Sequence, residues 1–151
     1  MDPIDVQLLN LLQQDCSRSL AELGSEVGLS ISAAKARLTK LRARGDVRAY
    51  VALIDPQRLG YRVCAFVQVL VDGKKNEQAF LAGMSRIPEV QECHRISGEF
   101  PCLLKVWAPS LADLERFADE KIKSRAGVMR TLISIVLSSS KDHVTGLAAR
   151  G

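Results

Sequence analysis

The sequence lacks the features of a membrane protein or a secreted one. Aromatic residues make up only 5% of the chain, and no apolar run approaches the ~20 residues that a membrane-spanning helix needs. The chain begins Met1-Asp2-Pro3, and no basic stretch leads into an apolar one there, as a signal peptide would require. Its cysteines, at positions 16, 64, 93 and 102, form no C-x-x-C pair. We therefore expect a protein of the reducing cytoplasm, without membrane contact and without a metal site.

Motifs of common enzyme families are also missing. The chain has no G-x-G-x-x-G, no G-x-x-x-x-G-K-[ST] and no H-E-x-x-H. Cys93 and His94 stand together, as a thiol nucleophile and its base would, but neighbouring residues on a strand point to opposite faces. We predict no catalytic residues, no cofactor and no enzyme activity.

The chain does have an ordinary globular composition and a focused positive charge. Among 151 residues, 47% are hydrophobic and 25% are charged, and the net charge is +4. Six basic residues fall within a short stretch in which Asp46 is the only acid: Lys35, Arg37, Lys40, Arg42, Arg44 and Arg48. A surface that contacts phosphate groups has this character, although a solvated helix face can be basic by chance.

Capping signals and apolar residues at helical spacing predict three helices within the first 45 residues. Asp2 can cap the first helix, and Ser19 with Glu22 has the S-x-x-E form of a capping box for the second. Ser30 can cap the third, which ends at Gly45. Three such helices are enough for a small helical head.

The second and third predicted helices have the parts of a winged-helix-like helix-turn-helix. Gly24 allows close contact between them, and Gly28 can make the turn. The third helix would enter the major groove, and a helical bundle that binds no nucleic acid is the alternative. Arg37 either packs within the head or contacts phosphate. The candidate DNA-binding residues are Ser30, Ser32, Ala33, Lys35, Ala36, Arg37, Thr39, Lys40 and Arg48.

The rest of the chain predicts an α+β body. Residues 48–54 are mostly β-compatible and predict a linker strand. Strands are then expected at 63–71, 90–97, 102–107 and 128–137, with one helix after the first strand and one after the third. The order β-α-β-β-α-β is that of the ferredoxin-like fold, an antiparallel sheet covered on one face by two helices.

Several segments carry a likeness to a known family. They are Ile4-Asp5, Leu20-Ala21-Glu22-Leu23, Val27-Gly28-Leu29-Ser30 and Arg37-Leu38-Thr39-Lys40-Leu41 in the head, and Pro88-Glu89-Val90-Gln91-Glu92-Cys93-His94 and Ser97-Gly98-Glu99-Phe100 in the body. Through these segments, the chain resembles the Lrp/AsnC (leucine-responsive/asparagine, feast/famine) regulators over nearly its whole length. The resemblance implies a sequence-specific DNA-binding transcription regulator. It also implies a homodimer joined through the bodies, a ring of dimers such as an octamer, and a small-molecule effector, an amino acid or related metabolite, bound where bodies meet.

With this resemblance, we predict four segments in the chain. They are a helix-turn-helix domain at 1–47, a linker strand and hinge at 48–62, a ferredoxin-like effector-binding and oligomerisation domain at 63–138, and a C-terminal tail at 139–151.

The resemblance also implies an effector pocket. Its residues are Gly98, Glu99, Phe100 and Pro101 in a loop, and Thr131, Ile133 and Ser134 on the last strand. The family's common G-D-x-D-Y form is here Gly98-Glu99-Phe100-Pro101-Cys102, without the second acid and the aromatic residue. Because Glu99 is the only acid in this loop, we predict that ordinary amino acids bind weakly and that the effector is atypical or absent.

A second hypothesis comes from a different class of protein. The chain would then be a small-molecule-binding or weakly catalytic ferredoxin-like protein whose helical head mediates assembly. Salt-dependent binding to duplex DNA separates the two hypotheses, because only the regulator requires it.

Overall fold

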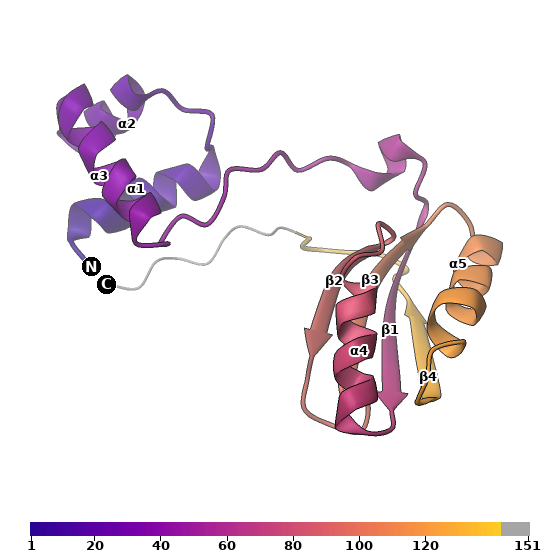
Figure 1. Cartoon of the computed structure of the whole chain (residues 1–151). Helices are drawn as coiled ribbons and strands as arrows, with labels where there is room; N and C mark the ends of the chain where they lie inside the picture. Colours follow the sequence, from indigo (N-terminus) through magenta and orange to yellow (C-terminus); the bar gives the residue numbers. More distant parts are fainter. Residues whose placement is uncertain (143–151) are drawn as a thin grey trace. The chain divides into compact units, whose positions relative to one another are not determined.

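Two compact units make up the protein. The computed structural model describes residues 1–142 (Figure 1). One unit, the head, contains Met1–Leu53, and the other, the body, contains Ile54–Ser140. The predicted α+β class, with a helical head followed by a ferredoxin-like body, is confirmed. The predicted tail falls largely on residues 143–151, which lie outside the described part of the chain.

The head consists of three helices whose starts are fixed by side-chain caps. They are α1 (Pro3–Gln14), α2 (Leu20–Glu26) and α3 (Ile31–Ala43). Asp2 accepts a hydrogen bond from the amide of Ile4 at 2.8 Å. Ser19 and Glu22 form both hydrogen bonds of the capping box, and Ser30 caps α3. All three predicted caps are therefore confirmed.

The turn between α2 and α3 depends on two glycines. Gly28 has a φ of +67°, a conformation that other residues rarely adopt. A Cβ added to the buried Gly24 would lie 2.7 Å from the carbonyl oxygen of Leu29, so a larger residue would push the helices apart. The helices close on a small core formed by Leu8, Leu23, Leu38 and Leu41.

The linker differs from its prediction. No strand occurs at positions 48–54, and the first strand of the described chain is β1 (Val63–Val71). A strand needs a hydrogen-bonding neighbour, and within residues 1–142 no segment pairs with this stretch. The described part of the head therefore has no β-wing, and the linker contains a short 3₁₀ helix, η1 (Pro56–Leu59).

The body is a four-stranded antiparallel sheet with helices on one face. After β1 come α4 (Lys74–Met84), β2 (Val90–Arg95), β3 (Cys102–Ala108), α5 (Leu111–Phe117), the π-helical segment η2 (Ala118–Lys123) and β4 (Val128–Ile135). The strand order is β2-β3-β1-β4. The strands predicted at 90–97 and 128–137 each end two residues earlier, at Arg95 and Ile135.

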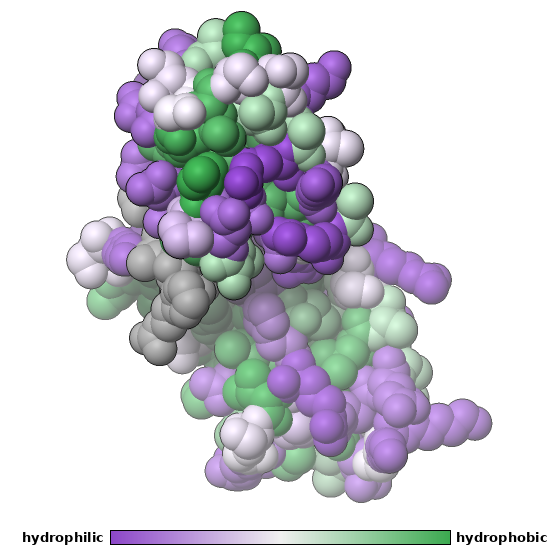
Figure 2. Space-filling model, turned by 90° about the vertical axis from the view of Figure 1, so that its left-hand side faces the viewer, coloured by the Kyte–Doolittle hydropathy of each residue, from purple (hydrophilic) through white to green (hydrophobic). Residues whose placement is uncertain are grey.

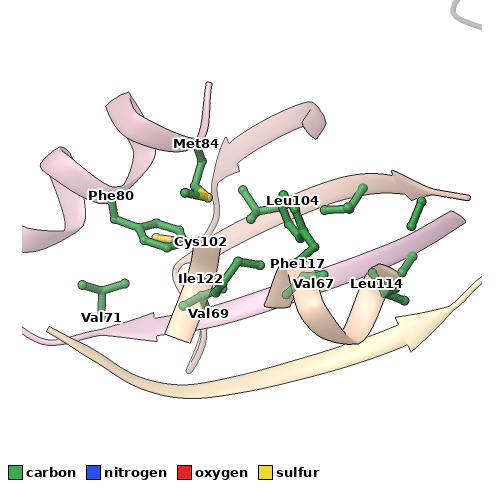
Figure 3. Close-up of a cluster of buried hydrophobic side chains, with 13 residues drawn as sticks. Val67, Val69, Val71, Phe80, Met84, Cys102, Leu104, Leu114, Phe117 and Ile122 are labelled. Atoms are coloured by element: carbon green, nitrogen blue, oxygen red, sulfur yellow. The ribbon is translucent and has the colours of Figure 1, made fainter. Parts of the chain in front are cut away.

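The core of the body lies between the sheet and its helices. Figure 3 shows Phe80 and Met84 of α4 pointing toward Cys102 and Leu104 of β3. Every second residue of β1 points into this core, because side chains on a strand alternate between its two sides. Among the described residues, no helix has the length and apolar character to cross a membrane.

Candidate nucleic-acid interface and effector site

Most of the predicted DNA-binding residues lie on the surface of the head. Arg37 and Ala33 are half-buried, and the others are exposed: Ser30, Ser32, Lys35, Ala36, Thr39, Lys40 and Arg48. The opposite side of α3 is buried through Ala34, Leu38 and Leu41. The exposed side of α3 is mainly polar, although Ile31 at its start is 56% exposed. Hydrophilic and apolar residues lie side by side on the face of the head shown in Figure 2.

Two of the six basic residues are neutralised inside the head. Asp5 is only 6% exposed, and it accepts hydrogen bonds from Arg37 at 2.9 Å and from Arg44 at 3.3 Å. Arg37 also pairs with Asp2, and Arg44 with Asp46. Hydrogen bonding to Asp5, and then to Asp2, raises the pKa of Arg37. These contacts tie α3 to the start of α1, which is a structural use of Arg37.

The other four basic residues have no such partner. No carboxylate among residues 1–142 lies within ion-pair distance of Lys35, Lys40, Arg42 or Arg48. The guanidinium of Arg42 lies over the ring of Tyr50, 5.6 Å from its centre, which leaves its charge uncompensated. The net positive charge of this surface therefore rests on these four side chains.

The hydroxyl groups of Ser30, Ser32 and Thr39 are partly occupied by local hydrogen bonds. Ser30 accepts from the amide of Ala33, and its oxygen lies 3.1 Å from that of Ser32. Thr39 donates to the carbonyl of Lys35. Each hydroxyl oxygen can still accept or share a further bond, so all three remain able to bind a phosphate or a base edge.

In the body, an arginine that the sequence analysis missed contacts the predicted effector loop. Arg130 of β4 pairs with Glu99 at 2.5 Å, and its guanidinium lies 5.2 Å from the centre of the Phe100 ring. Both ends of this contact are exposed, Arg130 at 62% and Glu99 at 63% of the side chain. The loop and β4 are 31 positions apart in sequence, so no local spacing signals the contact.

The three predicted effector residues of β4 do not share a face of the sheet. Thr131 and Ile133 pair with Val69 and Val67, whose side chains are buried beneath the helices, and Ile133 packs against that core. Ser134 pairs with Phe66 and so faces the opposite side, as Arg130 does. A single chain therefore brings only Glu99 and Phe100 together with β4, through Arg130.

The sheet face opposite the helices exposes large apolar residues among polar ones. Phe66 and Leu132 are 37% and 48% exposed there, and within residues 1–142 no helix packs over them. Lys105 lies on the same face and is only 8% exposed, with its amine 3.6 Å from Glu92. Large apolar side chains exposed on an uncovered sheet face are typical of a surface that packs against a partner.

Two cysteines of the body, Cys93 and Cys102, are poor nucleophiles. Burial raises the pKa of Cys93, and it raises that of Cys102 to about 11, so these thiols stay protonated at neutral pH. Among the described residues, no three His, Cys, Asp or Glu side chains form a group that could hold a metal ion.

Family models match both units. An AsnC-type helix-turn-helix domain matches residues 1–42, and an Lrp/AsnC ligand binding domain matches residues 64–145. The chain is 33% identical to the proline dehydrogenase transcriptional activator of Rhizobium radiobacter, over 94% of this chain and 92% of the relative. It is 32% identical to the leucine-responsive regulatory protein of Salmonella typhimurium, over 94% of this chain and 88% of the relative.

Solved structures show the same likeness over the whole chain. A transcriptional regulator from Neisseria meningitidis in complex with L-methionine superposes with a TM-score of 0.93 at 29% identity, covering 97% of this chain and 96% of that one. The feast or famine regulatory protein of Mycobacterium tuberculosis, also complexed with L-methionine, gives a TM-score of 0.88 at 32% identity, covering 96% and 97%. The relatives are regulators and not enzymes. The chain therefore belongs to the Lrp/AsnC family of transcription regulators, with an AsnC-type helix-turn-helix head and a ligand-binding body.

Proposed function

We propose that the head binds duplex DNA in a sequence-specific manner through α3 and the residues that follow it. The observation that carries this proposal is the separation of charges: Lys35, Lys40, Arg42 and Arg48 are free of carboxylates among the described residues, whereas Arg37 and Arg44 are neutralised. A helix-turn-helix places the exposed N-terminal part of its second helix in the major groove.

Each predicted DNA-binding residue then has a role that fits its chemistry. The hydroxyls of Ser30, Ser32 and Thr39 bind phosphates or base edges, and the methyl groups of Ala33 and Ala36 contact thymine methyls. Lys35 reaches a base edge or a phosphate, and Lys40 and Arg48 bind the backbone. Arg37 holds α3 in place by pairing with Asp5.

Selection of bound DNA tests this part of the proposal. The protein is mixed with a random duplex library, and the retained fragments are sequenced at several salt concentrations. We expect one enriched motif with two-fold symmetry, weaker for Lys35→Ala and unchanged for Lys75→Ala, an exposed lysine of α4. Retention without any enriched motif would contradict sequence-specific binding.

We further propose that two chains pair through the open sheet faces of their bodies. The exposed Phe66 and Leu132 lie on this face and would be covered by a partner sheet. Pairing of this kind gives two heads for the two half-sites of an operator. Further assembly into a ring of dimers, and a cytoplasmic location with the genome, complete the proposal.

Light scattering on the full chain tests the pairing. Phe66→Asp places a charge in the centre of the proposed interface, so we expect it to lower the molecular mass toward that of one chain. Leu111→Asp is the matched control, because Leu111 is 58% exposed at the start of α5, away from the open face. A Phe66→Asp protein that keeps the mass of the wild type would contradict this interface.

For the body, we propose an amino-acid effector bound at the loop of Gly98, Glu99, Phe100 and Pro101. Support comes from two structural relatives, each solved with L-methionine. Thr131, Ile133 and Ser134 lie on the adjacent part of β4 but face both sides of the sheet, so their contribution requires that bodies meet at this edge. The effector would alter how bodies assemble and thereby how heads meet DNA.

A further inference from the structure

The basic residues of α3 form two stripes on different sides of the helix. Lys35 and Arg42 are seven positions apart, and so are Arg37 and Arg44. Seven residues make about two turns of an α-helix, so each pair shares a side, whereas the step from Lys35 to Arg37 turns the helix by about 200°. A helix in the major groove has a phosphate backbone on each side. Both stripes would therefore reach phosphates if both were free.

Within residues 1–142, only one of the two stripes is free of carboxylates. Arg37 and Arg44, the second stripe, share Asp5 at 2.9 Å and 3.3 Å. Arg37 also pairs with Asp2 at 3.1 Å, and Arg44 with Asp46 at 2.8 Å. Three carboxylates thus face two guanidinium groups. This side of α3 therefore offers no net positive charge to a phosphate.

Asp5 is the most deeply buried of these three carboxylates. Its side chain is 9% exposed, against 43% for Asp2 and 23% for Asp46. An exposed ion pair is easily exchanged for another, whereas a buried carboxylate loses its compensation when its arginines leave. The side chains of Arg37 and Arg44 are themselves 31% and 52% exposed. Asp5 therefore holds two arginines that lie close enough to the surface to meet DNA.

We propose that Asp5 determines the specificity of DNA binding by keeping Arg37 and Arg44 off the phosphates. This inference rests on the proposed function of the head. Phosphate contacts add affinity for every sequence, and direct discrimination comes from contacts to base edges. With one stripe masked, α3 meets the backbone through Lys35 and Arg42, and a larger share of the binding free energy comes from bases. Asp5 thus raises the ratio of specific to non-specific affinity without contacting DNA.

Binding measurements on the full chain test this role. The motif enriched from the random library is compared with a scrambled duplex of the same composition, and both are titrated against salt. We expect Asp5→Asn to bind the scrambled duplex roughly threefold or more tightly, with a slope steeper by about 0.9 for each arginine that gains a phosphate. The ratio of specific to non-specific affinity should fall. Adding Arg37→Gln to Asp5→Asn should remove part of the gain in affinity and slope.

Two further variants separate release of arginines from a change in net charge. Asp15→Asn is the matched control, because it adds the same charge to the head, while Asp15 accepts hydrogen bonds from Ser17 and not from an arginine. We expect it to change affinity and slope far less. Asp46→Asn leaves the buried carboxylate in place and frees Arg44 from its more exposed partner. A smaller gain in the same direction is expected, and this variant decides the question if Asp5→Asn does not fold.

The results that would overturn the proposal are distinguishable. A folded Asp5→Asn protein that binds both duplexes more weakly, with an unchanged slope, would show that Asp5 only supports the fold. Equal gains in Asp15→Asn and in the variant that frees an arginine would show that net charge alone is responsible. In both cases sequence-specific binding by the head stands. If the wild type enriches no motif, the proposed function of the head fails and this inference fails with it.

Discussion

Within residues 1–142, the head closes on four buried apolar residues, whereas the body closes on thirteen. The head compensates with local devices: three helix caps, a glycine turn, and ion pairs of Arg37 and Arg44 around the buried Asp5. The body depends on pairing between strands that are distant in sequence.

This difference means that charged residues have two tasks in the head. Asp5 removes two arginines from the basic surface and uses them to hold α3. The basic residues without a carboxylate partner are therefore the ones we expect to contact DNA. In the body, by contrast, the buried cluster is apolar, and the ion pair of Glu99 and Arg130 is exposed.

The largest expected effect comes from matched core truncations in the two units. Leu41 in the head and Leu104 in the body are both fully buried, and Leu→Ala at such positions costs about 2–5 kcal/mol. We expect Leu41→Ala to remove hydrogen-exchange protection from peptides of the head and to leave the body protected, because its core is the smaller. Leu104→Ala should instead lower protection in the body. Equal loss in both units from Leu41→Ala would mean that they unfold together.

A smaller effect is expected from the capping box of α2. Ser19→Ala removes the hydroxyl that accepts from the amide of Glu22, and loss of such a cap costs about 1 kcal/mol. Ser25→Ala, on the exposed side of the same helix, is the control and should be nearly neutral. Urea denaturation followed through head amides measures both. If the two variants are equally stable, the box contributes nothing.

The smallest expected effect is a loss of stability of the head at low pH. Hydrogen bonding with Ser19 lowers the pKa of Glu22, and hydrogen bonding to the amide of Ile4, then to Arg37, lowers that of Asp2. A carboxyl with a lowered folded-state pKa stabilises the fold above its unfolded pKa, and this stabilisation disappears as the pH falls through the folded value. We therefore expect the head to lose stability as the pH falls below about 4.5, the ordinary value for Glu. In Glu22→Gln the loss should be smaller, and an identical pH profile would show that Glu22 is not involved.

Local signals allowed much of the fold to be predicted. The caps at Asp2, Ser19 and Ser30 and the turn at Gly28 act within a few residues, so the sequence spacing is sufficient to identify them. The bounds of β1 were also predicted correctly, because a buried strand between turn residues gives a clear apolar run.

Long-range partners could not be predicted in the same way. The linker at 48–54 has β-compatible residues, but its strand has no partner within the described chain. The contacts of Asp5 with Arg37 and Arg44 span 32 and 39 positions, and that of Arg130 with Glu99 spans 31. A basic run in a sequence does not reveal which of its members are neutralised. The alternation of β4 could have shown that Thr131 and Ser134 face opposite sides.

The salt dependence of DNA binding tests most directly whether the free cations, and not the neutralised ones, contact DNA. Each phosphate contact contributes about 0.9 to the slope of log K against log salt, so removing one per chain from a dimer lowers the slope by roughly two. We expect this decrease for Arg48→Ala and no decrease for Arg44→Ala, whose side chain already pairs with Asp5 and Asp46. A folded Arg48→Ala protein with the wild-type slope, or an equal decrease in Arg44→Ala, would contradict the account.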